Sequence, residues 1–154
     1  MQYVLSQFIK ICLTNNFLKL RIKPNIKPYL QSKIIFIMIH FKDSTLQALE
    51  FIRQAVMELP SVTEKICFET PAFYANKKIF ARIKEDGESL VLYNEERNLW
   101  INKDPKTFFI TPHYENYKYM LINLERVEPE ELKQLLKLAW QQRAPKSAVK
   151  QMNL

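Results

Sequence analysis

The only glycine of the chain marks a β-hairpin. Gly87 follows Asp86, and an Asp-Gly pair between two apolar runs is a strong hairpin signal, because tight turns require positive φ angles. Before the turn, Lys78–Lys84 alternates between two sets of side chains, and Ser89–Tyr93 forms the returning strand. The scarcity of glycine also excludes the Gly-rich loops that cradle phosphates in nucleotide-binding proteins. These features predict an antiparallel sheet without such a loop.

Two amphipathic helices are predicted, one before and one after the strands in the sequence. The first follows a capping box at Ser44–Gln47, has apolar residues at helical spacing up to Leu59 and is followed by Pro60. The last helix opens near Pro129, a residue that is favoured at the first helical position. Its predicted buried stripe comprises Leu132, Leu135, Leu136, Ala139 and Trp140.

The remaining elements define the fold class. Ile66–Tyr74 reads as a strand with a bend or an edge position at Pro71, because proline cannot donate to a strand ladder. A short helix is predicted after Asn94, and two strands near 107–111 and 119–124 follow it. The prediction is an α+β fold, a two-layer α/β sandwich of order α-β(3)-α-β(2)-α. Hairpin links imply an antiparallel sheet with helices on one face.

Positive charge is concentrated at the N-terminus. Residues 1–37 contain six of the 23 basic residues and none of the 16 acidic ones, so residues 38–154 hold 17 basic and 16 acidic residues. The net charge of +7 is therefore weak support for DNA binding by the domain itself. Residues 1–37 are also rich in amino acids that AT-rich codons encode. We expect 38–154 to be the domain and 1–37 an extension outside the fold.

We predict that Met38 is the native initiator and that residues 1–37 arise from a gene-start error. The intact mass of the native protein tests this, and a mature chain that begins well before Met38 would contradict it. A secretory signal fits poorly, since Lys10 interrupts the apolar run and no cleavage site follows. A basic amphipathic membrane anchor remains the alternative.

The sequence predicts a cytoplasmic, non-catalytic protein without a cofactor. Cys12 and Cys67 form no CxxC pair, and no His and Cys cluster supplies the four ligands of a zinc site, so no metal is expected. No run of 18 apolar residues exists, so no membrane partner is expected. His113 has no nucleophile with an adjacent base near it in the sequence.

One strand of the hairpin is the candidate nucleic-acid surface. Lys78, Phe80, Arg82 and Lys84 are predicted on one side of their strand, opposite Ile79, Ala81 and Ile83. Cations can follow a phosphate backbone, and a ring can stack on a base. The alternative is an open sheet face of solvated Lys and Arg side chains, with Phe80 buried or half-covered. The nucleic-acid interpretation requires that Arg82 and Lys84 are free of neighbouring acids and that no helix covers them.

Further candidates lie in a loop and at the C-terminus. His113 can contact phosphate, or it can be a turn residue whose ring bonds backbone carbonyls. Tyr114 and Lys118 repeat the combination of aromatic and basic residues. Arg143, Lys146 and Lys150 can extend a basic surface, or they can complement the negative end of the last helix.

Several motifs resemble the MmcQ/YjbR family. They are Thr70-Pro71-Ala72-Phe73, Lys78–Arg82, Asp104-Pro105, Phe108–Tyr114, Trp140 and Ala144-Pro145-Lys146, and the resemblance spans about Met38 to Lys150. It implies a secretion-chaperone-like, two-layer α/β fold whose element order matches the one predicted above. It also implies DNA binding through a proposed double-wing arrangement, and it implies no reaction. The alternative function is a protein- or peptide-binding adaptor, for which only the chaperone-like fold argues.

Overall fold

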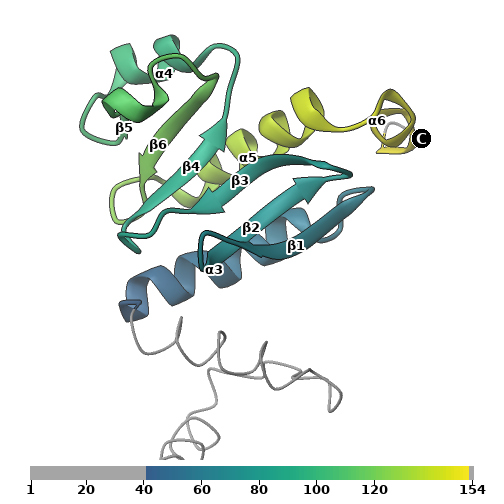
Figure 1. The fold of residues 1–154 in the computed structure, drawn as a ribbon, viewed down its shortest axis with the longest axis horizontal. Coiled ribbons are helices and arrows are strands. Elements are labelled where there is room, and N and C mark those ends of the chain that lie inside the picture. Colours follow the sequence, from purple (N-terminus) through teal and green to yellow (C-terminus); the bar gives the residue numbers. More distant parts are fainter. Residues whose placement is uncertain (1–40, 153–154) are drawn as a thin grey trace, which may run out of the picture. The chain divides into compact units, whose positions relative to one another are not determined.

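The computed structural model describes residues 41–152, so the predicted extension 1–37 lies outside the described residues. The elements in chain order are α3 (Asp43–Val56), β1 (Val62–Cys67), β2 (Thr70–Ala75), β3 (Lys78–Ile83), β4 (Ser89–Tyr93), α4 (Arg97–Lys103), β5 (Phe108–Phe109), the 3-10 turn η1 (Pro112–Tyr114), β6 (Tyr119–Asn123), α5 (Pro129–Arg143) and α6 (Lys146–Met152). The strands form one antiparallel sheet of order β1-β2-β3-β4-β6-β5, and α3 and α5 cover one of its faces (Figure 1). The predicted α+β fold class is confirmed.

The sheet has six strands where five were expected. Residues 66–74 were predicted as one strand, but they contain the end of β1, a tight turn and most of β2. Phe68 and Glu69 make this turn with φ angles of 50° and 61°. Neither residue is a usual choice for positive φ, so the sequence does not signal the hairpin. Pro71 lies within β2, and pairing with β3 begins only at the next residue, so its missing N–H is no loss there.

The core lies between the sheet and the helices. Side chains on the helix side of β2, β4 and β6 alternate with side chains on the other face, as the pleat of a strand requires. The predicted stripe of α5 is buried as expected, and the indole Nε1 of Trp140 donates to the carbonyl of Pro60 at 3.0 Å. The predicted capping box is wrong: α3 begins at Asp43, Lys42 is its N-cap, and Ser44 lies inside the helix.

A β-bulge breaks the alternation of β3. Phe73 pairs with Ala81, whereas the next residue, Tyr74, pairs with Ile79, so Phe80 is an extra residue in the ladder. Phe80 consequently joins Ala81 in the helix-side core and has no exposed surface. The prediction that Phe80 shares a face with Arg82 is therefore wrong, because period-two alternation assumes an unbroken ladder.

We predict that Phe80→Ala lowers the free energy of unfolding by about 3–5 kcal/mol, because it leaves a cavity in a closely packed core. Phe68→Ala is the matched control, since the Phe68 side chain is 70% exposed, and its cost should stay below about 1 kcal/mol. Urea denaturation of both variants measures the difference. Equal losses of stability would contradict the assignment of Phe80 to the core.

Candidate nucleic-acid interface

The face of the sheet opposite α3 and α5 is only partly covered. Its side chains include Lys65 of β1, Tyr74 of β2, Arg82 of β3 and Tyr93 of β4. Over the β4–β6 half, Tyr114 of η1 packs on Val91 and Leu121 in a small second core. We call this side of the sheet the open face; it is the side that was predicted to carry a cationic strand.

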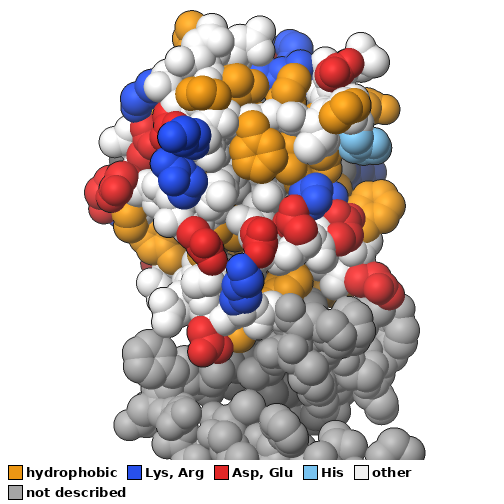
Figure 2. Space-filling view, turned by 90° about the vertical axis from the view of Figure 1, so that its left-hand side faces the viewer, with side chains coloured by type: hydrophobic (Ala, Val, Ile, Leu, Met, Phe, Trp, Pro, Cys, Tyr) orange, Lys and Arg blue, Asp and Glu red, His pale blue; other side chains and the backbone are white. Residues whose placement is uncertain are grey.

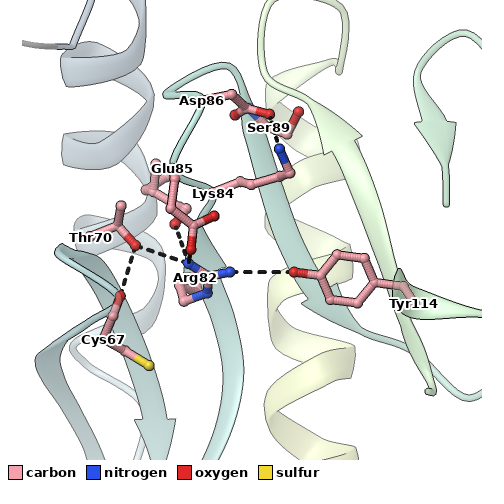
Figure 3. Close-up of polar contacts among 9 residues, drawn as sticks. Cys67, Thr70, Arg82, Lys84, Glu85, Asp86, Ser89 and Tyr114 are labelled. Carbon is pink, nitrogen blue, oxygen red and sulfur yellow. Dashed lines mark hydrogen bonds and ion pairs between the residues drawn. The ribbon is translucent and has the colours of Figure 1, made fainter. Parts of the chain in front are cut away.

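Arg82 is buried in a polar network on the open face (Figure 3). Its Nη1 donates to Glu85 Oε1 at 2.6 Å and to Thr70 Oγ1 at 3.3 Å, and its Nη2 donates to Tyr114 Oη at 3.3 Å. Thr70 Oγ1 in turn donates to the Cys67 carbonyl at 3.0 Å. The guanidinium carbon also lies 5.1 Å from the centre of the Phe68 ring. Arg82 therefore ties together the β1–β2 turn, β3 and η1.

The electrostatics of this network favour the ion pair. Burial lowers the pKa of Arg82, but the hydrogen bonds to Glu85 and Tyr114 outweigh it, so the pKa lies above its ordinary value. Burial raises the pKa of Glu85, and the Arg82 hydrogen bond reverses this, so the net shift is downward. Both groups are charged at neutral pH. Because only 7% of Arg82 is exposed, a phosphate cannot reach it without displacing Glu85.

The cationic strand face predicted from the sequence is absent from the structure. Phe80 lies in the core, Arg82 is paired with Glu85, and Lys84 is 2.7 Å from Asp86. The two acids belong to the hairpin turn that follows β3, so the turn neutralises the cations of its own strand. Of the four strand candidates, only Lys78 is an exposed cation without an ion pair among the described residues.

The loop candidates lie in one segment over the open face. His113 is exposed and stacks edge-on against the buried ring of Tyr114, with 4.7 Å between ring centroids. Lys118 is paired with Glu95 at 3.3 Å, so its charge is partly compensated. The neighbouring Tyr117 is 55% exposed.

Arg97, which the sequence did not single out, holds this loop in place. Its Nη1 donates to the carbonyls of Tyr114 at 2.6 Å, Tyr119 at 2.9 Å and Tyr117, and its Nη2 donates to the Glu115 carbonyl at 2.7 Å. A planar fork of donors suits several carbonyls at once, which a lysine could not match. No sequence motif predicts this role, because every residue has a backbone carbonyl and the acceptors of Arg97 therefore cannot be recognised by residue type.

Unpaired cations gather at the end of the domain near α6. Arg143 donates from Nε to the Ile79 carbonyl at 3.1 Å, and its guanidinium lies 4.4 Å from the centre of the Tyr93 ring. The tight β2–β3 turn meets the α3–β1 loop, where the Asn76 N–H donates to the Ser61 carbonyl at 2.9 Å. Figure 1 places this turn and α6 at the same end of the domain. We call the cations of this region the cationic end: Lys77, Lys78, Arg143, Lys146 and Lys150.

The cationic end is defined by where its cations lie rather than by pairing alone, since Lys65, Arg97, Lys106, Arg126, Lys133 and Lys137 also form no ion pair in the described part of the chain. None of its five cations forms an ion pair among residues 41–152, whereas Lys42, Arg53 and Lys103 all do. On the side shown in Figure 2, which is the left-hand side of Figure 1, basic and acidic side chains are interspersed. The three predicted residues Lys78, Arg143 and Lys146 are thus brought together, away from the buried Arg82.

The described residues contain no group of three or more His, Cys, Asp or Glu side chains placed to hold a metal ion. Across the same part of the chain, each helix is too short or too polar to cross a bilayer. Cys67 is a free, half-buried cysteine.

Comparison with known proteins identifies the fold first and then the family. The crystal structure of Deinococcus radiodurans protein DR2400, which contains the family domain DUF419, matches with a TM-score of 0.53 and 24% sequence identity, over 69% of this chain and 88% of that one. A family model described as YjbR matches residues 57–142. Since this match covers more than half of the sequence, the chain belongs to the YjbR family, and the resemblance seen in the sequence is confirmed.

Curated relatives share part of this region. The uncharacterized proteins Mb2600 of Mycobacterium bovis and Rv2570 of Mycobacterium tuberculosis are each 31% identical over 68 residues. The match covers 44% of this chain and 46% of each relative, so the chain spans about half the length of the curated relatives it matches.

The Arg82–Glu85 pair predicts a specific pH dependence of stability. The pKa of Glu85 in the folded protein lies below its ordinary value of 4.5, so the pair contributes fully above pH 4.5 and loses its contribution as the pH falls below that value. Glu85→Gln should therefore be less stable than the wild type at pH 7, and the difference should shrink between pH 4.5 and pH 3. Thermal unfolding across this range measures it. A difference that does not change with pH would contradict the pairing.

Proposed function

We propose that this YjbR-family chain is a DNA-binding protein that holds the phosphate backbone with its cationic end. The observation that carries the proposal is the gathering at one end of the domain of five cations without acidic partners among the described residues: Lys77, Lys78, Arg143, Lys146 and Lys150. Lysine and arginine side chains without acidic partners are the groups that track a phosphate backbone. The condition set for the β3 face fails, because Arg82 and Lys84 are paired with acids, so the proposal no longer rests on that face and rests on the cationic end instead.

The geometry of the cationic end suits backbone contact rather than base reading. Lys77 lies in the two-residue β2–β3 turn and Lys78 follows it, and both are exposed. Lys146 and Lys150 are exposed four residues apart on α6. Side chains at this spacing lie on the same face of a helix. Their long, flexible stems fit point contacts to phosphates and carry little sequence information. We therefore expect binding that depends strongly on salt and weakly on sequence.

Residues 1–37 complicate any binding measurement, because they carry six further cations. Binding of DNA by the full chain alone does not locate the contacts. Charge-matched variants do, because they remove the same charge from different places on the domain.

We predict that Lys146→Gln plus Lys150→Gln weakens DNA binding by the full chain and lowers the slope of log K against log salt concentration by about 1.8. This value follows from about 0.9 for each phosphate contact to B-DNA. Fluorescence anisotropy with a labelled duplex at several salt concentrations measures both quantities.

Lys42→Gln plus Lys103→Gln is the control, since both lysines are exposed and paired with acids. It removes the same charge and should leave the slope nearly unchanged. If the two double variants had equal effects, DNA would be attracted by the overall positive charge of the protein rather than by contacts at the cationic end. An absence of binding at low salt would exclude the proposed function.

A second candidate function is protein binding, which two observations favour. β1 lies at the edge of the sheet with one side paired to β2, and the exposed ring of Phe68 follows its last residue. An extended peptide can add to such an edge and place an apolar side chain beside the ring. However, Glu64 and Lys65 sit in the middle of β1, and charges on an edge strand discourage pairing with other chains. We therefore place this adaptor function second.

A further inference from the structure

A continuous strip of planar groups crosses the open face. The Phe68 ring centre lies 5.1 Å from the Arg82 guanidinium carbon, and Arg82 donates to Tyr114 Oη at 3.3 Å. The Tyr114 ring is 4.7 Å from His113, and His113 is 6.0 Å from Tyr117 with an interplanar angle of 33°. We call these five residues the ring strip. Figure 3 shows its centre, where Tyr114 points across the sheet toward Arg82.

The strip is buried in its middle and exposed at both ends. Arg82 and Tyr114 are largely buried, whereas Phe68 and Tyr117 are 70% and 55% exposed. A single exposed ring is ordinary on a protein surface, so it is the connection of Phe68 and Tyr117 through Arg82, Tyr114 and His113 that distinguishes this pair. Here the middle of the strip acts as a support, and the ends offer free ring faces to a ligand.

Both ends of the strip are held in position before any ligand binds. Phe68 belongs to a two-residue turn with positive φ at both positions, and Arg82 stacks on its ring. The Tyr117 carbonyl accepts a hydrogen bond from Arg97, which also holds Tyr114. A ring carried by a fixed backbone loses less conformational entropy when a ligand stacks on it than a ring on a mobile loop.

The charges beside the strip argue against phosphate as its ligand. Glu69 follows Phe68, Glu115 lies between the two tyrosines of the loop, and Glu85 neutralises Arg82. Acids at these places repel a polyanion, so the strip can contribute to DNA binding only through its rings. Stacking uses the π-face that every base presents, and it requires bases that are not paired in a duplex.

We propose that the ring strip stacks unpaired bases, so that this protein prefers single-stranded DNA over a duplex. This inference rests on the proposed function, in which the cationic end holds the phosphates. Two further cation–ring pairs lie on the open face: Lys65 over Tyr74 at 5.1 Å, and Arg143 over Tyr93 at 4.4 Å. They lie on the open face between the ring strip and the cationic end. These two regions are roughly 20 Å apart, because the six residues of β2 run from the Phe68 turn to the Lys77 turn.

The test is a comparison of two DNA forms with four variants of the full chain. A labelled single strand and its duplex are titrated at one salt concentration with the wild type, Phe68→Ala, Tyr117→Ala, Phe68→Leu and Phe68→Trp. We expect each alanine variant to weaken single-strand binding between about fivefold and a hundredfold, as loss of one stacked base does elsewhere. Duplex binding should change less than about twofold.

The Leu and Trp variants separate stacking from simple apolar contact. Phe68→Trp keeps a planar ring and should retain single-strand binding, whereas Phe68→Leu keeps only apolar surface and should lose as much as Phe68→Ala. Retention by Phe68→Leu would overturn the stacking proposal and favour the apolar contact expected of a protein partner. Thermal midpoints of all variants confirm that each one is folded.

The binding results distinguish failure of the stacking proposal from failure of the proposed DNA-binding function. If the alanine variants bind both DNA forms like the wild type while Lys146→Gln plus Lys150→Gln weakens both, the ring strip has no role and the cationic end stands. If the wild type binds neither form at low salt, the proposed function and this inference fall together. A wild-type preference for duplex would overturn the single-strand proposal alone.

Discussion

The β-bulge at Phe80 determines which side chains reach each face of the sheet. One extra residue in β3 moves this ring into the core, while Arg82 stays on the open face opposite Val91. Pairing between β3 and β4 covers only Ala81–Ile83, so Ile79 and Phe80 lie outside it. The Ile79 carbonyl therefore accepts side-chain hydrogen bonds, from Tyr119 Oη and from Arg143 Nε, both at 3.1 Å. These two bonds anchor the end of α5 beside the tyrosines of the open face.

The structure separates charge from aromatic surface. Around Arg82, acids from the β3–β4 hairpin neutralise the cations, and the exposed rings of Phe68 and Tyr117 lie beside the exposed acids Glu69 and Glu115. Near α6, five cations have no acidic partner in the described part of the chain. An almost neutral domain can therefore still offer a local phosphate-binding surface, because binding depends on where the unpaired charges lie. This separation motivates the division of roles between the cationic end and the ring strip.

Local sequence patterns predicted the elements that depend on local interactions. The buried stripe of α5 follows from apolar spacing. The hairpin at Gly87 follows from the Asp-Gly pair, and Gly87 has the positive φ that such a turn needs, 69°. The β1–β2 hairpin was missed because Phe68 and Glu69 are not turn residues by type, and the sheet imposes their conformation. The bulge was missed for a related reason, since nothing in the sequence from Lys78 to Lys84 interrupts its regular alternation.

The candidate site was predicted less well, because its properties depend on distant pairs. The cations of β3 are visible in the sequence, but their neutralisation depends on the path of the following turn. Tyr114 reaches Arg82 across 32 residues of sequence, and Arg97 binds carbonyls up to 22 residues away. Arg143, Lys146 and Lys150 were predicted together as a C-terminal cluster that can extend a basic surface, whereas their location near Lys78 depends on the docking of α5, where Arg143 donates to the Ile79 carbonyl. Residue type predicted the chemistry of these contacts but not their common location.

Chemical-shift mapping of the backbone amides during a DNA titration tests the central claim most directly. The account predicts that salt-sensitive shift changes concentrate at Asn76–Lys78 and at Lys146–Lys150. The hairpin turn Glu85–Gly87 should change little, because its acids remain paired with Arg82 and Lys84. Large changes at this turn, with an unchanged cationic end, would contradict the account and restore the β3 face as the site of DNA binding.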